Sequence, residues 1–200
     1  MIIAMKKKKF FNIRMITTTG ILLAIEIVLQ LIGNYVYIGV LNLNFSLIII
    51  SLGAILYGPI VGGFLGLVSG VLTLFSPSTM SYFFSVSPIG TVLTCLLKTT
   101  VAGVIAGLIM ILFKKYKKDT IGTIVVGIAV PTINTGIFAI FCLLFFMKKL
   151  EEINPTNIAA ALFLVLIGFN YVFEVATTGI VTPSMYKIMQ HVSINNREHK

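Results

Sequence analysis

Long runs of apolar residues constrain the fold of this 200-residue chain more than any other feature. Hydrophobic residues make up 58% of it and charged residues only 10%, with a mean hydropathy of +1.05. A soluble domain with a hydrated surface does not reach such values. A spanning helix needs about 20 residues, so the chain has room for roughly six spans and little else. The sequence therefore predicts an all-α membrane protein, a six-transmembrane-helix bundle forming a single domain over residues 1–200.

The expected helices follow the apolar runs and the turn residues between them. The tripeptide "YGP" at 57–59 predicts a tight turn between the second and third helices, because glycine and proline favour turns. Pro131 falls near the middle of the fifth helix and is expected to kink it. The six predicted helices cover approximately residues 14–33, 44–57, 60–75, 91–113, 120–147 and 157–189.

Lysine and arginine residues predict the orientation of the bundle. With six spans both termini share one side of the membrane, and the other side holds only Lys148 and Lys149. Cytoplasmic segments are enriched in basic residues, so we expect both termini in the cytoplasm and loops 34–43, 76–90 and 148–157 outside. The same distribution favours membrane orientation over nucleic-acid binding as the reason for the net charge of +9. The basic side collects Lys6–Lys9, Arg14, Lys114, Lys115, Lys117, Lys118, Lys187, Arg197 and Lys200.

Lys98 lies inside the fourth apolar run, where an ammonium costs at least ~2.5 kcal/mol on insertion scales. Thr91, Thr94 and Lys98 follow an i, i+3, i+7 pattern and so share one helix face, and Glu26 and Gln30 are an i, i+4 pair. At about 1.5 Å per residue, Glu26 lies about 12 Å below the outer end of its helix and Lys98 about 10 Å below Thr91. The two charged residues are therefore expected at similar depth.

Two more helices add polar groups at membrane depth. The fifth contributes Asn134 and Thr135, and the sixth contributes Asn170, Tyr171 and Glu174. On a structural interpretation, Lys98 pairs with Glu26 and the amides join helices to one another. On a functional interpretation, these groups converge on a small-molecule pocket in the outer half of the bundle. The substrate-binding residues then expected are Lys98, Thr94, Asn134, Thr135, Asn170, Tyr171, Glu26 and Gln30.

Aromatic residues of the outer loops are candidates to cover such a pocket, although aromatic residues at an interface also form membrane belts. They are Tyr35, Tyr37, Tyr82, Phe83 and Phe84.

The chemistry of an enzyme is missing from the apolar runs. His191 and His199 are both in the C-terminal tail, so no histidine is available there as a general base or metal ligand. Ser69 has no base to activate it, and no P-loop sequence is present. We expect no catalytic residue, no metal and no cofactor, with any ATP hydrolysis on a partner subunit.

Small residues recur at four-residue spacing on three helices, a pattern that lets helix backbones approach closely. Internal packing accounts for Gly62, Gly66 and Gly70 and for Gly103 and Gly107. A second row, Gly20 and Ala24, lies near the cytoplasmic end of the first helix, where it is also placed to contact a partner's helix.

The chain resembles the substrate-binding S component of an energy-coupling factor (ECF) vitamin transporter. The resemblance rests on "TTTGILLAIEIVLQ" in the first helix, "SLGAILYGPIVGGFLGLVSGVL" at 51–72, "SPIGTVLTCLLKTTVAGVIAGLI" at 87–109 and "PTINTGIF" at 131–138. It implies six helices and an outward-facing vitamin site. It also implies partners, a transmembrane coupling subunit and two ATPases. In the family an Ala-x-x-x-Ala row on the first helix meets the coupling subunit, and the matching positions here are Gly20 and Ala24.

The stretches "PTINTGIF" and "CLLK" are most similar to the pantothenate branch of the family. The resemblance implies that Lys98 neutralises the substrate carboxylate while Asn134, Thr135 and Asn170 bind its polar groups. Glu26 and Glu174 fit an anion poorly unless paired, and they leave open a pyrimidine or pyridoxine relative. In this family the loaded S component topples in the membrane to present the vitamin inward, and ATP hydrolysis resets the complex. A purely structural subunit stays open, as does a self-sufficient secondary carrier for hydroxymethylpyrimidine, pyridoxine, riboflavin or folate.

Overall fold

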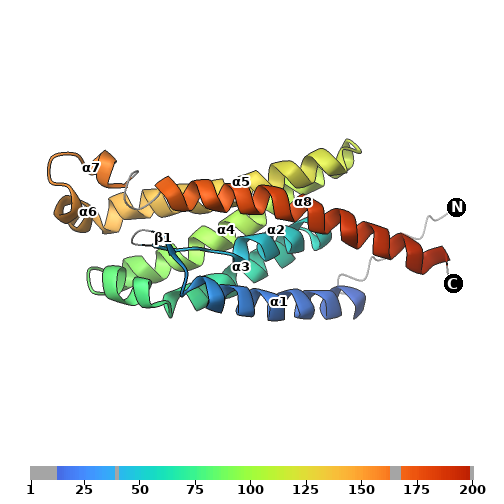
Figure 1. Ribbon diagram of the computed structural model, residues 1–200, viewed down its shortest axis with the longest axis horizontal. Coiled ribbons are helices and arrows are strands. Elements are labelled where there is room, and N and C mark those ends of the chain that lie inside the picture. Colours follow the sequence, from blue (N-terminus) through green and yellow to red (C-terminus); the bar gives the residue numbers. More distant parts are fainter. Residues whose placement is uncertain (1–12, 39–40, 163–167, 199–200) are drawn as a thin grey trace, which may run out of the picture.

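The structure is a computed structural model that describes residues 13–38, 41–162 and 168–198. Within these ranges six main helices form one elongated bundle, which confirms the expected all-α architecture (Figure 1). Three of them, α1, α4 and α5, are long and apolar enough to cross a membrane, whereas α2 and α3 are shorter apolar helices. The main helices are α1 (Ile13–Gly33), α2 (Ser46–Tyr57), α3 (Pro59–Leu74), α4 (Pro88–Lys115), α5 (Asp119–Phe145) and α8 (Gly168–Glu198).

The last predicted helix, 157–189, ends earlier than the helix in the structure. Its described residues belong to the short α7 (Ile158–Ala160), to the helical residues 161–162 and to α8, which continues to Glu198. Residues 163–167 of the expected helix lie outside the described ranges. The helix extends past 189 because neither glycine nor proline follows Pro183 to end it.

The expected outer loops contain short elements of their own. In the first, β1 (Tyr37–Ile38) pairs antiparallel with β2 (Leu41–Asn42). The second contains η1 (Thr79–Phe84), a π-helix, and the third contains α6 (Met147–Ile153). α4 begins at Pro88, earlier than predicted, because the Ser87 hydroxyl accepts the Gly90 N–H at 3.2 Å and caps the helix.

The turn between α2 and α3 confirms the interpretation of "YGP". Gly58 has a φ of 88°, which favours glycine, and Pro59 occupies the first turn of α3, where its missing N–H costs no hydrogen bond. This turn lets α2 fold back against α3, and every residue of α2 from Ser46 to Ile55 is buried. α2 is therefore the central core helix of the bundle.

α3 and α4 pack backbone to backbone through their glycines. A Cβ atom added at Gly66 would collide with the backbone of Thr99, and one added at Gly70 with the backbone of Cys95 and Leu96. Gly103 of α4 meets the backbone of α3 in the same way. These glycines therefore serve internal packing, as the four-residue spacing predicts.

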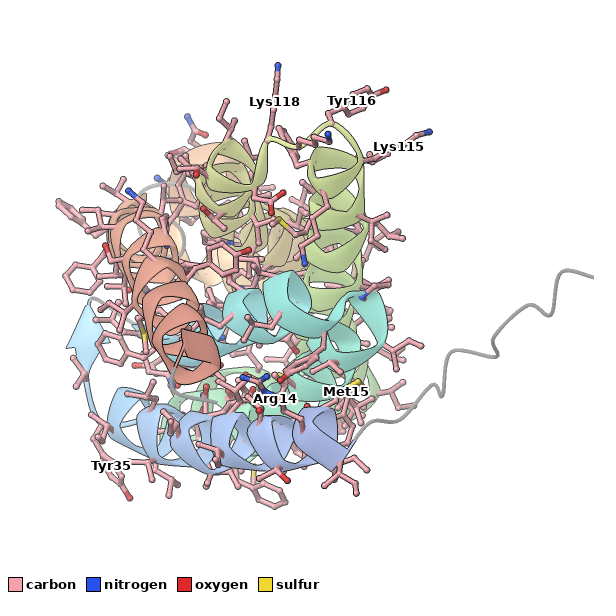
Figure 2. The ribbon with its side chains drawn as sticks, turned by 90° about the vertical axis from the view of Figure 1, so that its right-hand side faces the viewer. Arg14, Met15, Tyr35, Lys115, Tyr116 and Lys118 are labelled. Atoms are coloured by element: carbon pink, nitrogen blue, oxygen red, sulfur yellow. The ribbon has the colours of Figure 1, made fainter. Side chains whose placement is uncertain are left out.

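The elements of the bundle gather at two ends (Figure 1). One end holds the start of α1, the last residues of α8 and the turn between α4 and α5. The other end holds β1, α6 and α7. Lys115, Tyr116 and Lys118 project outward from the α4–α5 turn (Figure 2). The basic turn thus lies at the same end as the start of α1.

Candidate functional site

A cavity of about 70 Å³ lies between the helices in the half of the bundle that carries β1 and η1. A bound water needs roughly 10–15 Å³ on this measure, so the cavity has room for several waters or a small molecule. Its wall is built from α1, the loop between α1 and α2, α3, η1, α4, α5 and α8. The lining residues are Gln30, Asn42, Asn44, Thr73, Thr79, Phe83, Thr91, Thr94, Cys95, Lys98, Asn134, Thr135, Phe138, Phe146, Asn170, Tyr171 and Glu174.

One face of α4 lines this cavity, as its spacing predicts. The hydroxyl of Thr91 donates to the Ser87 carbonyl at 2.8 Å, and that of Thr94 donates to the Gly90 carbonyl at 2.6 Å. Each hydroxyl proton is thus used within the helix, and each oxygen keeps lone-pair capacity to accept a hydrogen bond.

Lys98 is half-buried on the same face, and its Nζ lies 5.2 Å from the centroid of the Phe138 ring. Such a cation–π contact contributes about 0.5–2 kcal/mol, which does not offset the burial of a full charge. Within the described residues, no carboxylate forms an ion pair with this ammonium.

The amide side chains of α5 and α8 bring hydrogen-bonding capacity that the protein itself does not use. Asn134 and Asn170 are 4% and 8% exposed, and the Oδ1 atom of each is buried without a hydrogen-bond partner. Buried polar atoms are rarely left without a partner, so these two oxygens are places where a donor is missing. Thr135 lines the cavity beside them.

Tyr171 and Glu174 complete the α8 side of the cavity. The Tyr171 hydroxyl shares a 3.2 Å hydrogen bond with the hydroxyl of Thr132. Glu174 is 7% exposed, and its Oε1 accepts the backbone N–H of Asn44 at 3.2 Å. Both therefore contact other protein groups as well as the cavity.

Gln30 lines the cavity from α1 and is the centre of a hydrogen-bond network. Its Nε2 donates to Asn34 Oδ1 at 3.0 Å and to Thr73 Oγ1 at 3.3 Å. Asn42 donates to the same Asn34 oxygen at 3.0 Å, and the Ser78 hydroxyl donates to Asn42 Oδ1 at 3.0 Å. Gln30 thus joins α1 to α3 and to the loop before α2.

The structure separates Glu26 from the other predicted site residues. Glu26 is fully buried, is not among the residues lining the cavity, and neither of its carboxylate oxygens has a hydrogen-bond partner. Among the described residues, the Lys98–Glu26 ion pair of the structural interpretation does not form.

Of the loop aromatics expected to cover the pocket, Phe83 lines the cavity. Its ring packs edge-on against Phe138 and Phe146, with centroids 5.8 and 5.1 Å apart. Tyr35 and Tyr82 are exposed, Phe84 is half-buried, and the side chain of Tyr37 lies outside the described part. A hydrophobic wall under η1, rather than a tyrosine cover, therefore bounds this side of the cavity.

Sequence reasoning did not select Asn42 and Asn44, which line the cavity from the loop before α2. The alternation in "LNLN" at 41–44 was the available signal, because residues two apart in an extended segment face the same side. Other unselected lining residues are Thr73, Thr79, Cys95, Phe138 and Phe146.

The small-residue pair predicted to meet a partner lies on an open surface. Gly20 and Ala24 are both exposed, and a Cβ atom added at Gly20 would meet no atom within 4 Å. α1 lies along one edge of the bundle in both views (Figures 1 and 2). The open space around Gly20 differs from the close backbone contacts of the glycines between α3 and α4.

Comparison with known protein families identifies the family to which the chain belongs. Residues 14–186 match the family described as "ECF transporter, substrate-specific component". None of the curated proteins matches the chain. Proteins of this family are transport subunits without a catalytic role, which confirms that the chain is not an enzyme. It is a multi-pass membrane protein and belongs to the substrate-specific components of ECF transporters.

Proposed function

We propose that this protein captures a small water-soluble vitamin that carries a carboxylate, with pantothenate as the best candidate. The cavity between α4, α5 and α8 is the proposed binding site. The observation that carries the proposal is Lys98, whose ammonium lines the cavity with no ion-pair partner among the described residues. A carboxylate bound there gains a charge-assisted hydrogen bond.

The remaining polar groups fit the rest of such a molecule. Pantothenate carries hydroxyls and an amide besides its carboxylate, and hence several hydrogen-bond donors. The Oδ1 atoms of Asn134 and Asn170 are buried acceptors without partners, and Thr135 lies beside them. Donors from the substrate would satisfy both oxygens, which supports a polar, donor-bearing ligand over an apolar one.

For transport, we propose that the cavity opens to the outside and that both termini are cytoplasmic. The basic residues at the opposite end of the bundle support this orientation. The protein would then work with an ECF transmembrane coupling subunit and two ATPase subunits. Toppling of the loaded protein would present the vitamin inward, and ATP hydrolysis would reset the complex.

The test is to purify the protein, identify any co-purified small molecule by mass spectrometry, and measure pantothenate binding by calorimetry. We expect Lys98→Met to weaken binding about 10- to 100-fold, the effect of losing a hydrogen bond to a charged group. Lys115→Met is the matched control, because it removes the same charge from the exposed α4–α5 turn and should leave affinity unchanged. Equal affinity of wild type and Lys98→Met would assign Lys98 to helix packing.

A cationic or neutral vitamin is the second candidate, and Glu174 is the observation that favours it. A carboxylate in the cavity wall repels an anionic ligand, so it suits pyridoxine or hydroxymethylpyrimidine better than it suits pantothenate. Riboflavin and folate are tested by the same calorimetric measurement. A secondary carrier would transport its vitamin alone in liposomes under an ion gradient. The proposed S component should instead bind without transporting until the coupling subunits are added.

A further inference from the structure

Glu174 connects two segments that are 130 residues apart in the chain. Its Oε1 accepts the backbone N–H of Asn44, which belongs to the first loop, residues 34–45 between α1 and α2. The neighbouring residues also meet, since the rings of Phe45 and Phe173 pack edge-on with centroids 6.4 Å apart. One turn of α8 thus contacts the end of the first loop at two consecutive positions.

The same loop residues form part of the cavity wall. Asn42 and Asn44 both line the cavity, as does Glu174. The side chain of Asn44 is held from the other direction, because the Ser46 hydroxyl donates to its Oδ1 at 2.6 Å. The place of Asn44 in the wall therefore depends on one hydrogen bond to α8 and one to the start of α2.

Glu174 and Lys98 line one cavity with opposite charges, yet in the described part of the chain they form no ion pair. The Oε1 atom of Glu174 instead accepts the backbone N–H of Asn44. A hydrogen bond of this type to a carboxylate is charge-assisted, and it fixes the direction in which the side chain points. Because the acid is held on the α8 side, the ammonium on α4 stays available for an anion. On the proposed function, this accounts for an acidic residue in the wall of a site for a carboxylate substrate.

We propose that Glu174 is a positioning residue: it holds Asn44 and the end of the first loop in place as a wall of the cavity, and it is not the group that binds the substrate's charge. The proposal rests on the proposed function in one respect, the anionic substrate. The hydrogen bond needs an acceptor oxygen and not a negative charge. Glu174→Gln keeps an oxygen at this place, whereas Glu174→Ala removes it and leaves the Asn44 N–H without its partner.

Hydrogen exchange of the unliganded protein tests the positioning role without any substrate. We expect peptides covering residues 41–46 to exchange at least several-fold faster in Glu174→Ala than in wild type, with α3 and α4 unchanged. Glu174→Gln should exchange like wild type. Thr177→Ala is the matched control on α8, since the Thr177 hydroxyl bonds to carbonyls of its own helix. Unchanged loop exchange in Glu174→Ala, or faster exchange throughout the chain, would overturn the proposal.

Pantothenate binding by the same variants separates positioning from direct contact. We expect Glu174→Gln to bind more tightly than wild type, because a negative charge is removed from the cavity. Glu174→Ala removes the same charge but also the hydrogen bond to Asn44, so it should bind about tenfold more weakly than Glu174→Gln. Loss of binding in Glu174→Gln with normal loop exchange would show that the carboxylate contacts the ligand, and would overturn the proposal. Failure of the wild type to bind pantothenate would count against the proposed function, while the exchange result would still decide the role of Glu174.

Discussion

Two buried acidic residues, Glu26 and Glu174, differ in what their carboxylates contact. Glu174 accepts a backbone N–H and lines the cavity, whereas Glu26 is fully buried and both of its oxygens lack partners. A buried polar group without a partner costs about 1–3 kcal/mol, so Glu26 is a local weakness of the fold.

We predict that Glu26→Met raises the thermal stability of the purified protein, by an amount equivalent to about 1–3 kcal/mol, because it removes this unsatisfied group. Vitamin affinity should not change, since Glu26 does not line the cavity. Gln30→Met is the contrasting variant, because Gln30 makes several hydrogen bonds, and it should lower the melting temperature. If Glu26→Met bound the vitamin more weakly, Glu26 would be a substrate-binding residue, as the sequence predicts.

At the level of single residues, the sequence was informative where polar groups are expensive. A charge or an amide in an apolar run needs a reason, and that reasoning led to Lys98, Asn134 and Asn170, which line the cavity. The same reasoning also selected Glu26, which does not line the cavity. The cost of burying a polar group does not depend on whether its side chain points toward the cavity or toward another helix. Polar residues in loops carry no such signal, so Asn42 and Asn44 were not selected.

Among the elements, α1 and α3 use glycine in opposite ways. Gly66 of α3 meets the backbone of α4, whereas Gly20 of α1 has open space around it. Both belong to four-residue rows in the sequence, so the pattern alone does not distinguish a packed row from an open one. Only the placement of neighbouring helices does.

We predict that Gly20→Leu and Ala24→Leu leave vitamin binding intact but block uptake with the coupling subunits, because a larger side chain keeps two helices apart. Gly136→Leu is the matched control, since Gly136 on α5 also has no atom within 4 Å of an added Cβ. Uptake is measured in proteoliposomes and binding by calorimetry. Loss of both activities together would contradict a separate partner surface.

Gly66→Leu should act on the fold instead. Its side chain would collide with the Thr99 backbone, which cannot move as a flexible side chain can. Overpacking of this kind typically costs about 1–3 kcal/mol and here should exceed it. We predict a clear loss of folded yield and a lower melting temperature, read by size-exclusion chromatography and thermal unfolding. Wild-type stability of Gly66→Leu would mean that α3 and α4 do not meet at this point.

The helices themselves were predictable because long apolar runs leave a chain few other structures in a bilayer. The turn at Gly58 and Pro59 was equally readable. The short elements η1 and α6 were not, because each depends on packing between distant segments, such as Phe83 against Phe146. Their sequences alone look like loops.

For the whole molecule, we predict that Tyr35→Cys reacts with a membrane-impermeant thiol reagent on intact cells, whereas Lys118→Cys reacts only after permeabilisation. Both native side chains are exposed, and the native Cys95 and Cys142 are buried. Tyr35 comes just before β1, which lies at the end of the bundle opposite to the α4–α5 turn that carries Lys118 (Figure 1). The wild type is the control for reaction of the native cysteines. The reverse labelling pattern would invert the orientation and place the cavity on the cytoplasmic side.

The shortness of α3 has a consequence for the surrounding lipid. Its 16 residues span about 24 Å, less than the roughly 30 Å of a typical hydrocarbon core. Its outer face nevertheless presents exposed apolar side chains, among them Ile60, Phe64 and Leu67. Acyl chains beside this helix must therefore shorten or tilt, at a fraction of a kcal/mol for each ångström of mismatch. We therefore expect the bilayer to be thinner along this flank, and membranes of long-chain lipids should accommodate the protein least well.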